Sequence, residues 1–117
     1  LAKVNSQSFS EDTGRLLENA VYLHLRRTAH QLFYYREKKE CDFLVFDGKQ
    51  CKEIIQVAQR VYKDNLSREI GGLLEAAQHL SMRTGKIITL DQEDNWKEGG
   101  IEIDIIPFHR WVEGLPQ

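Results

Sequence analysis

Apolar residues recur at helical spacing in two long segments of the chain. Between residues 14 and 30 the pattern consists of Leu17, Ala20, Val21, His24 and Leu25, and Leu16 and Leu23 widen it. Within residues 64–83 it consists of Leu66, Ile70, Leu73, Leu74, Ala77 and Leu80. A period of about 3.6 residues predicts an amphipathic helix in each segment. Residues 108–115 fit a shorter terminal helix.

Short runs of aromatic and β-branched residues predict five strands, at residues 32–36, 41–46, 52–59, 86–90 and 101–106. The first three are joined by connections too short for a crossover, so we expect an antiparallel meander. The fourth strand follows a helix, which favours parallel pairing. Residues 91–100 read as a loop. The order is α-β-β-β-α-β-β-α, and the predicted fold is α/β with a mixed central sheet and helices on its faces.

Local signals refine this picture. Residues 1–12 are largely polar and are interpreted as a tail or linker, which leaves 13–115 as one domain. Asp64 can cap the second long helix. Gly71 and Gly72 lie inside that helix, where each costs about 1 kcal/mol relative to alanine, so we expect them to permit close packing against the sheet.

Composition narrows the function classes. The 117 residues are 41% hydrophobic and 29% charged, which is typical of one soluble globular domain. Sixteen Lys and Arg face eighteen Asp and Glu, and this balance argues against coating nucleic acid through bulk charge. No apolar run approaches the roughly 18 residues that cross a bilayer, and no signal-peptide pattern opens the chain. Cys41 and Cys51 lack metal-ligand spacing, so the expected compartment is the cytoplasm.

Common catalytic motifs are missing. The sequence contains no GxxxxGK[ST], GxGxxG, GxSxG, HExxH or CxxC pattern, so this stretch is not itself a phosphate-cradling ATPase. Its four histidines are scattered without ligand spacing. We expect no cofactor in this domain apart from Mg²⁺ at the acidic residues described next.

Acidic residues form the informative constellation. Glu18 lies in the first long helix, and Glu40 and Asp42 open the second strand. Strand alternation and hairpin pairing can bring Asp42 near Gln56 and Ala58 of the third strand. A helix packed on that face would add Glu18. Two carboxylates that converge from a helix and a strand predict a Mg²⁺ site at Glu18 and Asp42.

Four segments carry a resemblance to a known family: GRLLENAVYLHL, YYREKKECDFLVF, KEIIQVAQR and REIGGLLEA. Their order resembles the restriction-endonuclease-like, PD-(D/E)XK nuclease fold. More narrowly, it is similar to the uncharacterised C-terminal domain of bacterial and archaeal AAA-type ATPases. The similarity covers about residues 13–115. It implies that an ATPase domain of the same chain precedes this one, and the start at Leu1 rather than Met agrees with a piece of a longer protein.

The family implies an active site of a helix Glu, a strand Asp, a second strand acid and a lysine. Glu18 and Asp42 match the first two. Gln56 stands where the second acid should be, and Ala58 stands where the lysine should be. Loss of the charge-stabilising lysine alone costs several kcal/mol of transition-state stabilisation. We therefore expect a nuclease-like domain that is catalytically inactive and contacts protein or nucleic acid.

Two alternatives remain open at this stage. The first is a Mg²⁺-dependent nuclease with a rearranged site that uses Glu18, Asp42 and one of Glu53, Lys52 or Gln56. A different strand register would bring Glu53 opposite Asp42. The second is a DNA-binding module without cleavage. Its contacts, which would equally serve a protein partner, are Arg26, Arg27, Lys38, Lys39, Arg60 and Lys63. In a purely structural interpretation, Glu18 is a solvated helix residue and Asp42 pairs with Lys39 or Arg60.

Overall fold

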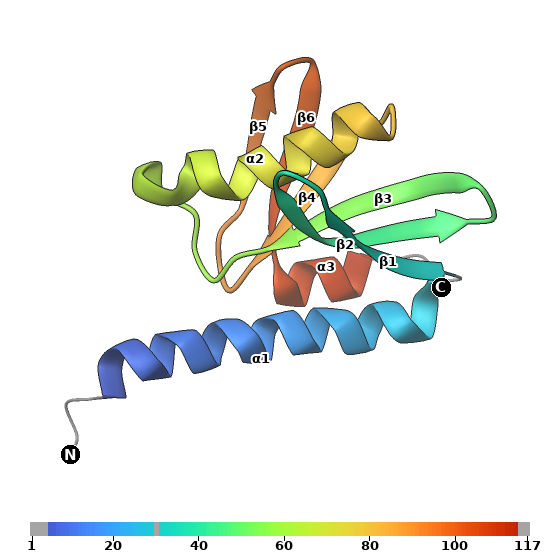
Figure 1. Ribbon diagram of the computed structural model, residues 1–117. Coiled ribbons are helices and arrows are strands. Elements are labelled where there is room, and N and C mark those ends of the chain that lie inside the picture. Colours follow the sequence, from blue (N-terminus) through green and yellow to red (C-terminus); the bar gives the residue numbers. More distant parts are fainter. Residues whose placement is uncertain (1–4, 30, 115–117) are drawn as a thin grey trace.

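The computed structural model describes the backbone of residues 5–29 and 31–114, and the side chains in these ranges except those of residues 5–11 and 63. Within them lie a six-stranded sheet and three helices (Figure 1). The helices are α1 (Asn5–Thr28), α2 (Lys63–His79) and α3 (Phe108–Gly114). The strands are β1 (Gln31–Arg36), β2 (Glu40–Asp47), β3 (Gln50–Val57), β4 (Thr84–Thr89), β5 (Asp94–Glu98) and β6 (Ile101–Pro107).

The sheet is mixed, with the strand order β1-β2-β3-β4-β6-β5. β1, β2 and β3 form an antiparallel meander, and β4 pairs in parallel with β3 on one side and with β6 on the other. The α/β class, the meander and the parallel fourth strand are therefore confirmed. The parallel pairing exists because α2 carries the chain from the end of β3 back to the start of β4.

Two segments differ from the sequence interpretation. Residues 5–12, expected in a tail or linker, belong to α1. The loop expected at residues 91–100 is wrong, because Asp94–Glu98 forms β5 and pairs antiparallel with β6. Gly99 and Gly100 both adopt positive φ, which is the backbone of a tight hairpin turn. All five β5 side chains are exposed, so the strand has no apolar alternation that could have revealed it.

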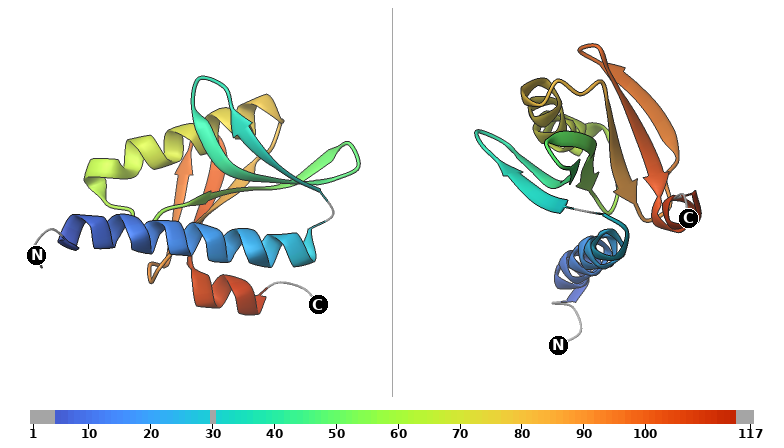
Figure 2. Two further views of the ribbon diagram at one scale, coloured as in Figure 1. Left: turned by 60° about the horizontal axis from the view of Figure 1, so that its bottom comes forward. Right: turned by 90° about the vertical axis from the view of Figure 1, so that its right-hand side faces the viewer.

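Two hydrophobic clusters fill the opposite faces of the sheet. The cluster on the α2 face includes Leu44, Ile54, Leu73, Ala76 and Ile103. The cluster on the other face includes Val21, Leu25, Phe43, Ile88 and Trp111, which come from α1, the sheet and α3. Figure 2 shows the resulting layers, with α2 on one side of the sheet and α1 beside α3 on the other.

The α2 helix lies very close to β2. A Cβ atom at Gly72 would overlap the carbonyl oxygen of Glu40, so only glycine fits at this crossing point. At Gly71 an added Cβ would instead meet the flexible end of Lys39. The close packing expected of this glycine pair is thus confirmed at Gly72. The start of α2 is capped by Asn65, whose Oδ1 accepts a hydrogen bond from the Tyr62 backbone N–H at 2.9 Å, rather than by Asp64.

Candidate functional site

A polar cavity of about 840 Å³ lies where α1, the start of β2, the end of β3 and the first turns of α2 meet. Its wall includes the side chains singled out in the sequence, Glu18, Asp42, Gln56 and Ala58. Three arginines and a further carboxylate also line it: Arg15, Arg60, Arg68 and Glu69. We refer to this cavity as the carboxylate pocket.

Asp42 and Gln56 lie side by side across the β2–β3 hairpin. The register pairs Phe43 with Ile55, so the next residues outward face each other. The backbone N–H of Asp42 donates to Gln56 Oε1 at 3.1 Å, and the backbone N–H of Val57 donates to Asp42 Oδ2 at 2.8 Å. The structure thus brings Asp42 and Gln56 together as the hairpin pairing predicted, and a backbone donor holds the Asp42 carboxylate in place.

Glu18 of α1 and Glu69 of α2 approach Asp42 from either side. Burial raises the pKa of the Asp42 carboxyl to about 7 against the opposing effect of the Val57 N–H bond. The negative charges of Glu18 and Glu69, and a hydrogen bond with the Glu18 side chain, also raise this pKa. The Asp42 carboxyl group in this environment therefore titrates close to neutral pH.

Sequence reasoning missed Glu69. Its side chain is only 14% exposed, and its Oε1 accepts a hydrogen bond from Gln56 Nε2 at 3.1 Å. It lies on the α2 stripe that also carries Asn65, Gly72 and Ala76, all of which are buried. The sequence therefore did contain a signal for Glu69: it is an acidic residue on the buried face of a helix. A buried carboxylate requires a polar partner, so such a residue indicates a polar site inside the protein.

Ala58 contributes no functional group. Ala58 is buried, at 8% exposure, and its backbone N–H donates a hydrogen bond to the Ile88 carbonyl oxygen at 3.0 Å. The described side chains that line the carboxylate pocket include arginines but no lysine. Arg60 forms an ion pair with Asp91 at 3.7 Å, and Arg68 pairs with Glu69 at 3.5 Å. Across the described residues, no ion pair joins Asp42 to Lys39 or to Arg60.

The Mg²⁺ site that the resemblance implies is not supported by the donor set. In the part of the chain that the structure describes, no group of three or more His, Cys, Asp or Glu side chains is arranged to hold a metal ion. Asp42 Oδ2 and Gln56 Oε1 already accept backbone hydrogen bonds, and Gln56 Nε2 donates to Glu69. Asp42 Oδ2 and Gln56 Oε1 are therefore already engaged by backbone donors.

The relocated site with Glu53 opposite Asp42 is wrong. The hairpin turns at Gly48 and Lys49, and a β-bulge between Val45 and Phe46 places Glu53 opposite Val45. Glu53 forms an ion pair with Lys86 Nζ, away from the carboxylate pocket.

The structure distributes the candidate basic residues over separate places. Arg26 and Arg27 lie in the last turn of α1, near α3. Lys38 and Lys39 lie between β1 and β2, and Lys39 reaches toward Gly71 of α2 on the other face of the sheet. Arg60 lines the carboxylate pocket, and the side chain of Lys63 falls outside the described residues. They do not form a single patch.

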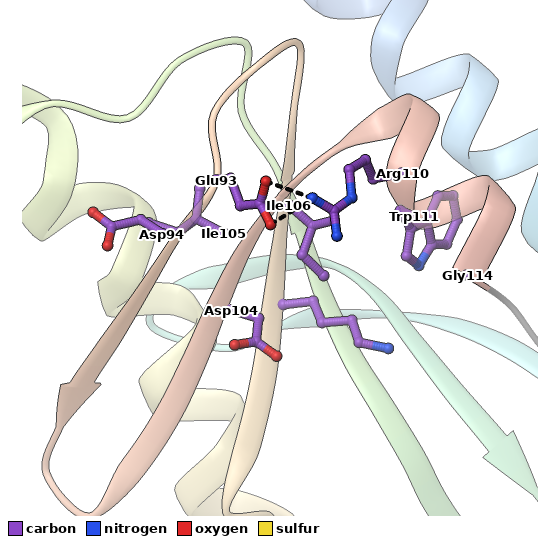
Figure 3. Close-up of a pocket in the computed structure, with 9 residues that line it drawn as sticks. Glu93, Asp94, Asp104, Ile105, Ile106, Arg110, Trp111 and Gly114 are labelled. Carbon is purple, nitrogen blue, oxygen red and sulfur yellow. Dashed lines mark hydrogen bonds and ion pairs between the residues drawn. The ribbon is translucent and has the colours of Figure 1, made fainter.

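A second cavity, of about 320 Å³, lies between β6 and α3 (Figure 3). Arg110 closes one side of it with two bonds to Glu93, both at 2.7 Å. Lys86 is paired with Glu53, and Asp104 accepts a hydrogen bond from Asn95. Because these charged groups are occupied by protein partners, the carboxylate pocket remains the candidate site.

Comparison with known proteins adds one relative. No family model matches the sequence. The chain is similar to the uncharacterized protein MJ1544 of Methanocaldococcus jannaschii, with 38% identity over 117 residues. The match covers 91% of this chain and 26% of that protein, so the chain spans about a quarter of its relative's length. None of the described helices is long and apolar enough to span a membrane.

Proposed function

We propose that this chain is a restriction-endonuclease-like domain of a larger cytoplasmic AAA-type ATPase, and that it contacts protein or nucleic acid without cleaving it. The element order and the mixed sheet support this proposal. The position of Glu18 on α1 beside Asp42 on β2 supports it as well. The larger context is supported by the relative from Methanocaldococcus jannaschii, of which the chain covers only 26%.

The observation that carries the proposal is the pair formed by Asp42 and Gln56. On the proposed fold, Gln56 stands in the place of the second acid, and its amide is bonded to the Asp42 backbone and to the Glu69 carboxylate. A neutral amide is a weaker Mg²⁺ ligand than a carboxylate, and Ala58 supplies no charge for a phosphoryl transition state. On this proposal, the pocket is a nuclease-like site that lacks two of its working groups.

The test combines metal titration with a cleavage assay. Calorimetry of the 117-residue chain with Mg²⁺ and Mn²⁺ should show no stoichiometric site, and DNA and RNA substrates should remain intact. Cleavage that is lost in both Glu18→Ala and Asp42→Ala would overturn the proposal.

Restoring the missing acid provides the complementary experiment. Gln56→Glu adds a carboxylate next to Asp42 and should create a stoichiometric Mn²⁺ site that calorimetry detects, because ligand charge sets the affinity of oxygen sites. Gln59→Glu is the matched control, since Gln59 lines the same pocket without bonding to Asp42. Equal gains in the two variants would show that Gln56 holds no special position.

The second candidate function is a Mg²⁺-dependent nuclease with a rearranged site. The observation that favours it is Glu69, which brings a third carboxylate toward Asp42 from α2. On this alternative Glu69→Ala abolishes metal binding and cleavage. Glu40→Ala, which removes an exposed carboxylate of β2 paired with Arg36, leaves both unchanged.

A further inference from the structure

One edge of the sheet carries an exposed tryptophan between two acidic residues. β5 is the last strand in the sheet order, and β6 is the strand that pairs with it. Trp96 of β5 is 37% exposed and lies opposite Ile103, which belongs to the cluster under α2. Because strand residues two apart share a face, Asp94, Trp96 and Glu98 all lie on the α2 side of the sheet.

An apolar groove lies between β5 and the start of α2. It has a volume of about 270 Å³, and its apolar lining includes Tyr62, Leu66, Trp96 and Ile105. Tyr62 is 54% exposed, so two exposed aromatic rings border the same recess. The indole N–H of Trp96 donates to Glu98 Oε1 at 3.1 Å, which holds one edge of this ring. Exposed aromatic side chains around a recess are typical of an interaction site.

The charge at this groove is negative. The described side chains that line it include Glu93 and Asp94 and no cation. Glu93 is neutralised by Arg110 through two bonds of 2.7 Å. Figure 3 shows the Asp94 carboxylate pointing away from this pair. Within the described part of the chain, neither Asp94 nor Glu98 forms an ion pair.

Three cations of the surrounding elements are occupied or lie apart from the groove. Arg60 lies just before α2 and pairs with Asp91 at 3.7 Å. Lys97 points to the opposite face of the sheet, where its register partner is Glu102. Arg83 precedes β4, which is separated from β5 by β6. A positively charged ligand is therefore favoured at the groove.

The backbone of β5 can accept a further strand. Because a two-residue turn joins β5 to β6, Glu98 and its register partner form the hydrogen-bonded pair that closes the hairpin. The pairs then alternate, so the N–H and C=O groups of Asn95 and Lys97 point away from β6. The Asn95 N–H donates to Asp94 Oδ1 at 2.8 Å. The other three groups face outward at the sheet edge, as an extended partner requires.

We propose that β5 binds an extended, basic segment of a partner protein, which adds to the sheet as a further strand. Its backbone pairs with the outward groups of Asn95 and Lys97. Its alternate side chains on the α2 side are lysines or arginines that face Asp94, Trp96 and Glu98. The cation beside the indole enters the groove, where the face of an aromatic ring attracts positive charge.

Charge distinguishes this occupant from a second copy of the chain and from nucleic acid. If two β5 strands paired antiparallel about Trp96, Asp94 of each copy would face Glu98 of the other, and like charges would repel. The same carboxylates would repel nucleic-acid phosphates. A basic strand satisfies the acids, the indole and the backbone edge together. This contact is additional to the carboxylate pocket, with which the groove shares only Tyr62.

Titration with a short basic peptide tests the proposal. The probe is the end-capped peptide Lys-Val-Lys-Val-Lys, whose lysines share one face of a strand, and the control is Glu-Val-Glu-Val-Glu. In nuclear magnetic resonance spectra of the 117-residue chain, the indole N–H signal of Trp96 should shift saturably. The signal of Trp111, which is 3% exposed, should stay in place. No saturable shift with the basic peptide, or an equal response to the acidic peptide, would overturn the proposal.

Matched variants test the groove, with the Kd of the basic peptide measured by calorimetry. Asp94→Asn, Trp96→Ala and Tyr62→Ala should each raise the Kd at least about threefold, because each removes a charge or a ring that contacts the cation. Glu102→Gln removes the same charge from the opposite face of the sheet, and Tyr34→Ala removes a ring that is also 54% exposed. These two controls should leave the Kd unchanged. Equal effects of variants and controls would refute the assignment to this groove.

Backbone methylation and sedimentation test strand addition and the choice of partner. Alternate backbone nitrogens of an extended peptide point to opposite edges, so two probes methylated on alternate nitrogens should differ, and one of them should lose binding. Equal binding of the two methylated probes would rule out an added strand. Self-association of the chain that is lost in Trp96→Ala would assign the edge to a second copy and would also overturn the proposal.

Discussion

Asp42 combines three physical effects in one carboxyl group. It is withdrawn from solvent, it accepts a backbone hydrogen bond from Val57, and it lies near the carboxylates of Glu18 and Glu69. Burial and like charge favour the protonated form, whereas the Val57 N–H favours the charged form. Because burial and repulsion prevail, the protonation of Asp42 is coupled to the folding of the chain.

The contribution of Asp42 to the free energy of unfolding should therefore fall as the pH rises from 3.8 through about 7. The pKa of Asp42 is higher in the folded state, at about 7, than the ordinary value of 3.8, so folding favours the bound proton. The stabilisation is complete below pH 3.8 and is lost as the pH rises through about 7. Asp42→Asn keeps an acceptor for Val57 and cannot ionise. The measurement is the free energy of unfolding from urea denaturation. The value for Asp42→Asn minus the value for the parent chain should increase by about 3 kcal/mol between roughly pH 5 and pH 8. Parallel stability curves for the two proteins would contradict this prediction.

At the scale of elements, the position of α2 is fixed by one point of close approach. Gly72 rests against the Glu40 carbonyl of β2, whereas Gly71 faces only the flexible end of Lys39. The two adjacent glycines occupy the same helix and differ in what a methyl group would meet. Substitutions at these two glycines therefore separate the effect of helix propensity on the free energy of unfolding from the effect of displacing the helix.

Alanine substitutions should give effects of opposite sign at these two positions. Gly72→Ala forces α2 away from β2 and should cost about 2–4 kcal/mol of the free energy of unfolding, comparable to overpacking a core. Gly71→Ala gains helix propensity and requires only a shift of Lys39, so it should be neutral or stabilising by up to about 1 kcal/mol. Thermal denaturation of the matched pair provides the measurement. Equal destabilisation would show that the close approach does not control the helix position.

Most of the elements that could be predicted from the sequence bury a periodic face. The stripes of α1 and α2 and the apolar runs of β2, β3, β4 and β6 follow directly from the packing of the two clusters. β5 was missed because its stability comes from backbone pairing with β6, and none of its side chains is buried. In the candidate site, Asp42 and Gln56 could be placed by strand alternation. Glu69 could not, because its position depends on how α2 crosses the sheet.

At the scale of the whole molecule, the sheet separates two cores that must both form. Leu73 belongs to the cluster under α2, and Leu25 belongs to the cluster under α1 and α3. Both are almost fully buried, at 0% and 2% exposure. The strands between them contribute side chains to both clusters, so loss of either core destabilises the same sheet.

A double-mutant cycle should show independent contributions to a single unfolding transition. Leu73→Ala and Leu25→Ala should each cost about 2–5 kcal/mol, the usual range for a buried leucine. Their coupling energy should stay below about 0.5 kcal/mol, because the two side chains lie in different clusters on opposite faces of the sheet. Chemical denaturation followed by both fluorescence and circular dichroism should show one coincident transition. Separate transitions for the two probes would indicate that the cores unfold independently.

The position of β4 between β3 and β6 has a consequence for the order in which the chain folds. The β1–β2–β3 meander and the β5–β6 hairpin are built from neighbours in sequence, so their loops close quickly. β4 has parallel partners on both sides, and its pairing with β3 requires the whole α2 crossover to close first. The central strand should therefore be the last to gain protection from hydrogen exchange during refolding, when it joins a meander and a hairpin that are already formed.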